Sequence, residues 1–113
     1  MLAATLDVET DDDTARFTLT VTNEGDDPVS LTFSDSQRFD FVVRAAEDDT
    51  ERWRWSDGQM FAQMLGSEEL APGESVAYDA EWTADDSDSG SFVCRGELAD
   101  NAQSASAESA FSL

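Results

Sequence analysis

Apolar and polar residues alternate with a period of two along most of the chain. The clearest run covers residues 17–22, where Phe17, Leu19 and Val21 alternate with three threonines. Such alternation is typical of a β-strand with one buried face. Similar runs occupy residues 2–8, 29–33, 39–43, 53–55, 76–82, 92–98 and 107–113. The pattern therefore predicts about eight short strands and almost no helix.

Turn-forming or acidic residues separate these runs. Residues 71–74 read Ala-Pro-Gly-Glu, with proline and glycine at the corners that a type II turn prefers. We expect residues 56–70 to be irregular and residues 100–106 to form a small, polar connection. Short strands at this spacing predict an all-β fold, an immunoglobulin-like antiparallel β-sandwich of about 7–9 strands, with a partly open barrel as the alternative. The length of 113 residues suits a single domain over residues 1–113.

The net charge of the chain indicates the environment in which this protein works. The chain has 26 acidic residues against six basic ones, all arginine, and a net charge of -20. The mutual repulsion should destabilise the fold in dilute buffer, whereas at about 1 M salt a screening length of roughly 3 Å removes most of it. Because the acids are spread over the whole chain, we interpret them as adaptation to a salt-rich, halophilic cytoplasm. An acidic patch for a basic partner is the alternative, and nucleic acid is excluded as a partner because phosphates require a basic surface.

The residues that most catalytic sites need are missing. The chain has no histidine and one cysteine, which excludes Ser-His-Asp and Cys-His nucleophiles as well as a tetrahedral zinc site. Residues 85–90 match the first ligand positions of a calcium loop, but Gly96 stands where a bidentate glutamate is required. We therefore predict a solvated loop there, no metal or other cofactor, and no enzymatic activity. Cys94 shares its parity with Phe92 and is expected in the core.

The N-terminal residues give an expectation about location. Residues 1–7 contain neither a basic stretch nor an apolar run, so they do not resemble a signal peptide. No segment approaches the roughly 20 apolar residues of a membrane span. A lone cysteine is compatible with a reducing compartment. We expect a cytoplasmic protein with no membrane partner.

Residues 52–66 combine the most unusual side chains of the chain. Two tryptophans alternate with two arginines, and a Ser-Asp-Gly turn follows. The apolar residues after the turn have a spacing that suits one helical turn, and they either cap the open end of the sandwich or form an exposed loop that docks into a partner. The candidate contact residues are Gln59, Met60, Phe61, Gln63, Met64 and Leu65. A second candidate loop, residues 34–39, offers Arg38 and Phe39 at a strand junction.

Three motifs in a fixed order carry a family resemblance. They are Leu31-Thr-Phe-Ser-Asp-Ser-Gln-Arg-Phe-Asp-Phe-Val-Val-Arg44, Trp53-Arg-Trp-Ser-Asp-Gly-Gln-Met-Phe61 and Leu70-Ala-Pro-Gly-Glu-Ser75. Together they resemble the intracellular proteinase inhibitor family, BsuPI, over roughly residues 15–100. The high acidity suggests a salt-adapted, haloarchaeal-type member.

The resemblance implies an immunoglobulin-like sandwich that inhibits subtilisin-type serine proteases inside the cell. The expected mechanism is occlusion of the active site by loops on a rigid scaffold. Protease clefts of this type accept extended chains and favour large apolar side chains, which residues 60–65 supply. The alternative function is a non-inhibitory interaction or accessory domain in the same salt-rich cytoplasm.

Overall fold

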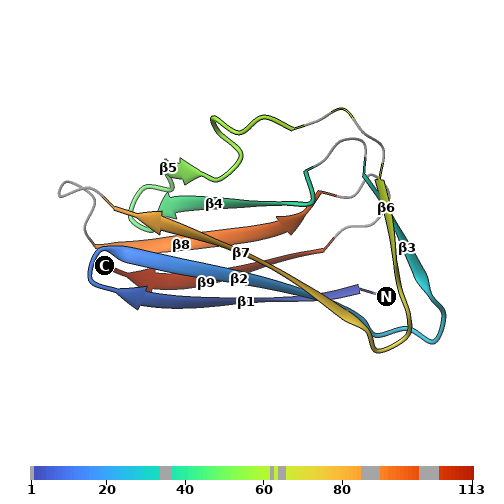
Figure 1. The fold of residues 1–113 in the computed structure, drawn as a ribbon. Helices are drawn as coiled ribbons and strands as arrows, with labels where there is room; N and C mark the ends of the chain where they lie inside the picture. The colour runs from blue at the N-terminus through green and yellow to red at the C-terminus, as the bar shows by residue number, and fades with distance from the viewer. Residues whose placement is uncertain (1, 34–36, 62, 64–65, 85–89, 100–104) are drawn as a thin grey trace.

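A computed structural model describes residues 2–33, 37–61, 63, 66–84, 90–99 and 105–113. Within these residues the protein is all-β, with nine strands in antiparallel sheets and no helix, which confirms the predicted fold class (Figure 1). No helix of the described part could therefore cross a membrane. The strands are β1 (Leu2–Asp11), β2 (Thr14–Asn23), β3 (Val29–Phe33), β4 (Phe39–Ala45), β5 (Glu51–Arg54), β6 (Gly66–Leu70), β7 (Ser75–Thr83), β8 (Ser91–Leu98) and β9 (Ser106–Ser112).

Two sheets form the layers of a sandwich. One has the strand order β1-β2-β7 and the other has the order β5-β4-β8-β9. The third sheet is a two-stranded ribbon of β3 and β6, which stands across one end of the sandwich (Figure 1). At one side of the sandwich β1 lies against β9. The layers are therefore closed on the β1 side by direct contact between the two sheets.

The predicted alternation places the core between these layers. Phe17 on β2 is fully buried, and its ring lies 5.8 Å from Phe41 on β4 and 5.5 Å from Phe111 on β9, measured between ring centroids. The threonines that alternate with Phe17 lie on the outer face. Each fully buried phenylalanine stabilises the fold by about 1.5–3 kcal/mol relative to an exposed one. Cys94 on β8 is also fully buried, as predicted, and burial raises the pKa of its thiol to about 12.

Gly96 lies at a position where the two layers approach closely. A Cβ atom there would lie 3.0 Å from the Phe41 ring and 3.3 Å from a methyl group of Leu19. A glycine inside a strand marks either a bulge or a close approach of another chain segment. The ladder between β4 and β8 runs through Gly96 without a register shift, so close packing is the reason for glycine.

The side chain of Asn23 joins the β3–β6 ribbon to the sandwich. Asn23 is fully buried at the end of β2, and its amide nitrogen donates to the carbonyl oxygens of Asp27 at 2.8 Å and Leu70 at 3.0 Å. Its amide oxygen accepts from the backbone N–H of Gly25. Beside it, Gly73 has a φ of 82°, which agrees with the type II turn predicted for residues 71–74. The Asn23 side chain thus holds both the turn between β2 and β3 and the turn between β6 and β7.

The prediction of an irregular segment over residues 56–70 is wrong for its last five residues. Gly66–Leu70 form β6, which pairs with β3 in register from Phe33↔Gly66 to Val29↔Leu70. Only Leu70 of this strand is buried. A strand that buries a single side chain has no apolar alternation, so the period of two could not reveal it.

Replacing Asn23 by aspartate should weaken this corner strongly. The substitution keeps the shape but puts a carboxylate against the carbonyl oxygens of Asp27 and Leu70, and the loss of buried donors costs about 1–3 kcal/mol, or more for a charged group. Urea unfolding in molar KCl measures the difference in stability. Glu24→Gln, at the exposed neighbouring position, is the control and should unfold like the parent. Equal unfolding midpoints for all three proteins would contradict this role of Asn23.

Candidate partner-binding loop

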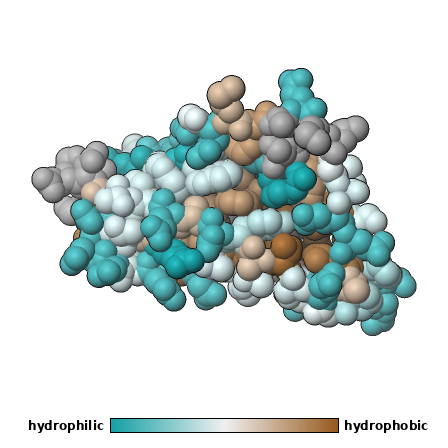
Figure 2. All heavy atoms as spheres, viewed as in Figure 1, coloured by the Kyte–Doolittle hydropathy of each residue, from teal (hydrophilic) through white to brown (hydrophobic). Residues whose placement is uncertain are grey.

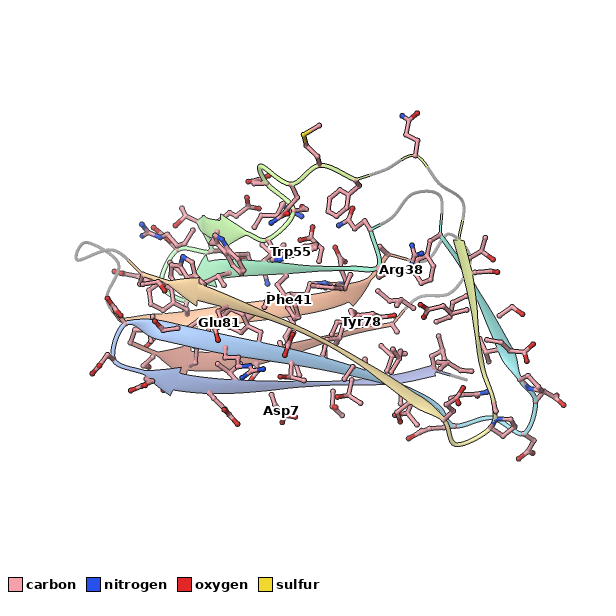
Figure 3. All side chains as sticks on the ribbon, viewed as in Figure 1. Asp7, Arg38, Phe41, Trp55, Tyr78 and Glu81 are labelled. Atoms are coloured by element: carbon pink, nitrogen blue, oxygen red, sulfur yellow. The ribbon has the colours of Figure 1, made fainter. Side chains whose placement is uncertain are left out.

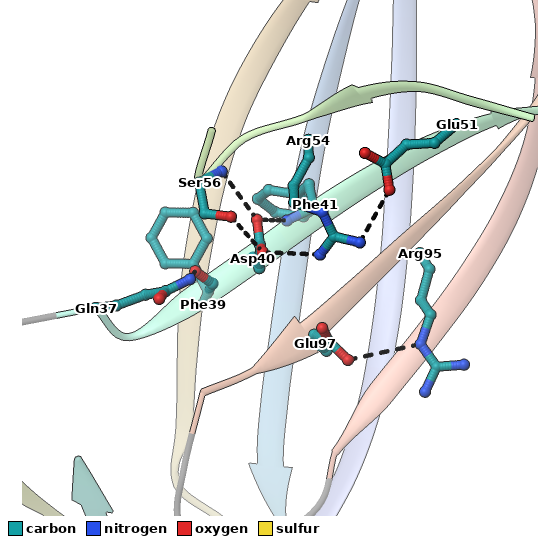
Figure 4. Close-up of polar contacts among 9 residues, drawn as sticks. All are labelled: Gln37, Phe39, Asp40, Phe41, Glu51, Arg54, Ser56, Arg95 and Glu97. Carbon is teal, nitrogen blue, oxygen red and sulfur yellow. Dashed lines mark hydrogen bonds and ion pairs between the residues drawn. The ribbon is translucent and has the colours of Figure 1, made fainter. Parts of the chain in front are cut away.

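The segment after β5 is anchored by one nearly buried carboxylate. Asp40 on β4 is 7% exposed and accepts hydrogen bonds from the backbone N–H of Ser56 at 3.1 Å and from its hydroxyl at 2.7 Å. The Arg54 guanidinium donates to the same carboxylate at 3.3 Å, and the backbone N–H of Phe41 donates at 2.9 Å (Figure 4). Asp40 therefore ties strand β4 to the turn that begins at Ser56.

Arg54 connects this anchor to β5 itself. Its second terminal nitrogen donates to the Glu51 carboxylate at 2.9 Å. The hydrogen bond to Glu51 and the negative charges of Glu51 and Asp40 raise the pKa of the guanidinium above its usual value, against the smaller opposing effect of burial. The arginine therefore remains charged and holds two carboxylates that would otherwise repel each other.

Aromatic stacking fixes the same segment from the core side. The Trp55 ring lies 4.4 Å from the Phe39 ring, and the Phe39 ring lies 5.0 Å from that of Tyr78 on β7. Trp53 stacks between Phe17 at 6.0 Å and Trp82 at 6.4 Å. The two tryptophans thus point inward while Arg54 faces outward, as the alternation of residues 52–55 predicts.

The residues after the turn differ in their exposure. Met60 is 97% exposed and is the large apolar side chain that stands out in the described part of the chain. Phe61 is partly buried, and its ring lies 5.7 Å from Trp55. Gln59 and Gln63 are exposed. The segment therefore holds one apolar side chain in solvent next to one that packs on the sandwich.

Parts of the first candidate loop lie outside the described residues. These are Met64 and Leu65, whose expected helical turn with Met60 and Phe61 stays a prediction, and no helix occurs at the described positions 59–61 and 63. The acidic loop at residues 85–89 is also outside. Among the residues that the structure covers, no group of three or more cysteine or acidic side chains could hold a metal ion.

Residues 34–36 of the second candidate loop lie outside the described residues, whereas its two candidate contact residues pack against the fold. The Arg38 guanidinium lies 4.4 Å above the Phe33 ring and 3.9 Å from the Glu68 carboxylate, and so connects β4 to the β3–β6 ribbon. Phe39 is the centre of the aromatic stack described above. The structure thus gives both residues packing contacts, and a role for them in binding a partner remains a prediction.

Sequence reasoning missed two residues that position the loop. Asp40 and Ser56 lie 16 positions apart, and neither belongs to the apolar alternation. The sequence does place the carboxylate of Asp40 between two phenylalanines within a predicted strand, which indicates that it lies close to apolar surroundings. Such a carboxylate needs partners when it is buried, but periodicity does not say where they lie.

The fold and this loop define a β-sandwich that presents an anchored, exposed apolar side chain. A family model described as intracellular proteinase inhibitor, BsuPI, matches residues 2–103. The chain belongs to this family, which confirms the resemblance found in the three motifs. No curated protein matches the sequence. The description of this family refers to inhibition of proteinases inside the cell.

Solved structures with a similar fold come from larger proteins. β-Glucosidase 3B from Thermotoga neapolitana matches with a TM-score of 0.56 and 16% identity, over 99% of this chain and 16% of that chain. β-Glucuronidase 2 from Bacteroides uniformis matches with a TM-score of 0.52 and 11% identity, over 99% of this chain and 13% of that chain. This chain thus spans about one sixth or less of their length. At such low identity these matches show the sandwich fold alone.

Removing the Asp40 carboxylate should loosen the candidate loop before the rest of the sandwich. Asp40→Ala leaves the partly buried Ser56 N–H and hydroxyl without their acceptor, at a cost of about 1–3 kcal/mol. We expect faster amide hydrogen exchange at Trp55, whose N–H donates to the Phe41 carbonyl at 2.9 Å. Asp57→Ala, an exposed carboxylate in the same turn, is the matched control. Unchanged exchange at Trp55 in Asp40→Ala would show that Asp40 does not anchor the loop.

Proposed function

We propose that this protein inhibits a subtilisin-type serine protease by inserting the loop of residues 59–65 into the active site. Membership of the intracellular proteinase inhibitor family supports a protease partner. The subtilisin type and the occluding loop are our own additions. The high negative charge supports a further element of the proposal, a salt-rich cytoplasm as the place of action.

The exposure of Met60 is the observation that carries the proposal. An apolar side chain that is 97% exposed gains free energy when a partner buries it. The Asp40 anchor and the Trp55 stack hold the start of the loop, which lowers the conformational entropy that this part loses on binding. Gln59 and Gln63, both exposed, provide hydrogen-bonding groups beside the apolar side chain. An apolar side chain that protrudes beside a fixed turn suits a cleft that accepts extended chains.

Arg38 and Phe39 are the less favoured contact in this proposal. Their packing against Phe33, Glu68 and Trp55 fits a supporting role. The alternative function is a non-inhibitory interaction domain.

Titration against a subtilisin-type protease in molar KCl tests the proposal. The parent protein should abolish activity at a near-stoichiometric ratio. Met60→Ser should weaken inhibition by roughly 10- to 100-fold, because burial of a methionine side chain is worth about 1.5–3 kcal/mol. Met60→Leu keeps an apolar side chain of similar size and should inhibit nearly as well as the parent.

The thermal unfolding midpoint separates binding from folding in this series. Since Met60 is almost fully exposed, neither substitution should change the midpoint. Cleavage of the parent as an ordinary substrate, or its failure to inhibit, would refute the proposal and favour the non-inhibitory domain. Equal inhibition by the serine and leucine variants would show that Met60 is not the contact residue.

Salt should stabilise the fold. Raising KCl from about 0.1 M to about 1 M shortens the screening length from roughly 10 Å to roughly 3 Å, which weakens repulsion among the 26 acidic residues. The unfolding midpoint should rise by several degrees in calorimetry. NaCl at equal ionic strength should act similarly if screening is the cause. A midpoint that is flat or falls with KCl would contradict the interpretation of the charge as salt adaptation.

A further inference from the structure

The two layers of the sandwich have unequal numbers of strands. The β1-β2-β7 sheet has three strands, whereas the β5-β4-β8-β9 sheet that it faces has four. β1 lies against β9 and β2 contacts β8, so the shortfall is on the side of β7 and β5 (Figure 1). On that side the described part of the smaller sheet has no strand opposite β5.

The outer edge of β7 has backbone groups available for such a strand. Within the described part of the chain, β7 forms a ladder with β2 alone, from Thr22↔Ser75 to Thr14↔Thr83. In an antiparallel pair every second residue directs its N–H and C=O groups away from the partner strand. β7 is nine residues long and therefore offers a regular row of donors and acceptors.

Aromatic side chains line the same side. Phe39, Trp53, Trp55 and Tyr78 are partly buried and stack between the two layers. Figure 2 shows residues of high hydropathy at the surface between β7 and the segment that follows β5, and Figure 3 labels Trp55 and Tyr78 in this region. Desolvation, reinforced by the nearby negative charge of Glu68, raises the pKa of Tyr78 to about 12. A strand added beside β7 would cover these rings with its inward side chains.

Charge decides which kind of strand fits. Asp79 and Glu81 lie on the outer face of β7 and are exposed. Arg16 on β2 forms an ion pair with Asp79 at 2.7 Å and faces Glu81 across the ladder, so two acidic side chains share one arginine and this stretch stays negative. Antiparallel pairing with β7 of a second copy would place Asp79 opposite Asp79, or opposite Glu81 if the pairing is centred on Ala80. Like charges directly opposite each other destabilise a strand pair. A strand with basic side chains at these outer positions would be attracted instead.

We propose that the β7 edge binds an extended segment of a partner protein by strand addition. The segment has apolar residues at alternate positions, which pack on Trp53, Trp55, Phe39 and Tyr78, and lysine or arginine between them, next to Asp79 and Glu81. Main-chain hydrogen bonds to β7 provide affinity, and the alternating side chains provide selectivity. This site shares Trp55 with the anchor of the loop at residues 59–65, but it can be tested without a protease.

A synthetic probe tests the site directly. The probe is a seven-residue peptide that alternates lysine and valine, titrated into the isotope-labelled protein at the lowest KCl concentration at which it stays folded. Chemical-shift changes should be greatest along β7 and at the indole N–H groups of Trp53 and Trp55. The control is a peptide of the same sequence that is N-methylated at alternate residues along the pairing edge. It should bind at least about tenfold more weakly, because it lacks the backbone N–H donors for β7 and its methyl groups obstruct pairing.

Two protein variants complete the test. Glu81→Lys should weaken binding of the peptide several-fold. Glu97→Lys makes the same change of charge on the outer face of the other sheet and should have a smaller effect on binding. Equal binding of the methylated and unmethylated peptides, or equal effects of the two variants, would reduce the interaction to non-specific attraction and overturn the proposal. Shift changes away from β7, or no binding at millimolar peptide, would overturn it as well.

Discussion

The burial of aromatic rings between two sheets is the constraint on which this structure depends. Phe17 lies at the centre and contacts rings from β4, β5 and β9, so one residue of β2 packs against three strands of the opposite layer. The chain carries a net charge of -20, and its acidic residues must occupy outer positions and turns if the rings are to pack. Alternation along most of the strands satisfies both requirements, because successive side chains point to opposite faces.

The same packing connects the fold to the proposed contact. Trp53 and Trp55 complete the core at the β5 side, and Asp40 holds the backbone that follows them. The conspicuous residues of the family motifs are thus largely those that build the sandwich and its corner. Met60 differs, since its side chain contributes almost nothing to the packing of the described residues. A residue that the fold does not require, at the end of a segment that the fold holds firmly, is where we expect the partner to bind.

Alternation predicted most of the strands because their apolar side chains lie on the face that packs against the core. It failed for β6, which buries only Leu70 and is held by pairing with β3. It could not reveal the Asp40–Ser56 contact, which depends on how β4 and the following turn meet in space. The candidate loop was located by the contrast between its apolar residues and a very polar chain. Met60 is exposed whereas Phe61 is partly buried, because the Phe61 ring packs on Trp55. The spacing of apolar residues in the sequence could not predict this difference.

Competition at the active site tests the central claim most directly. The parent protein is mixed with a subtilisin-type protease whose catalytic serine carries a bulky covalent sulfonyl group, and binding is compared with that of the unmodified protease by calorimetry in molar KCl. Occlusion by the loop predicts tight binding to the free enzyme and little or none to the blocked one. Equal binding to both enzymes would contradict it, because the domain would then recognise a surface outside the active site.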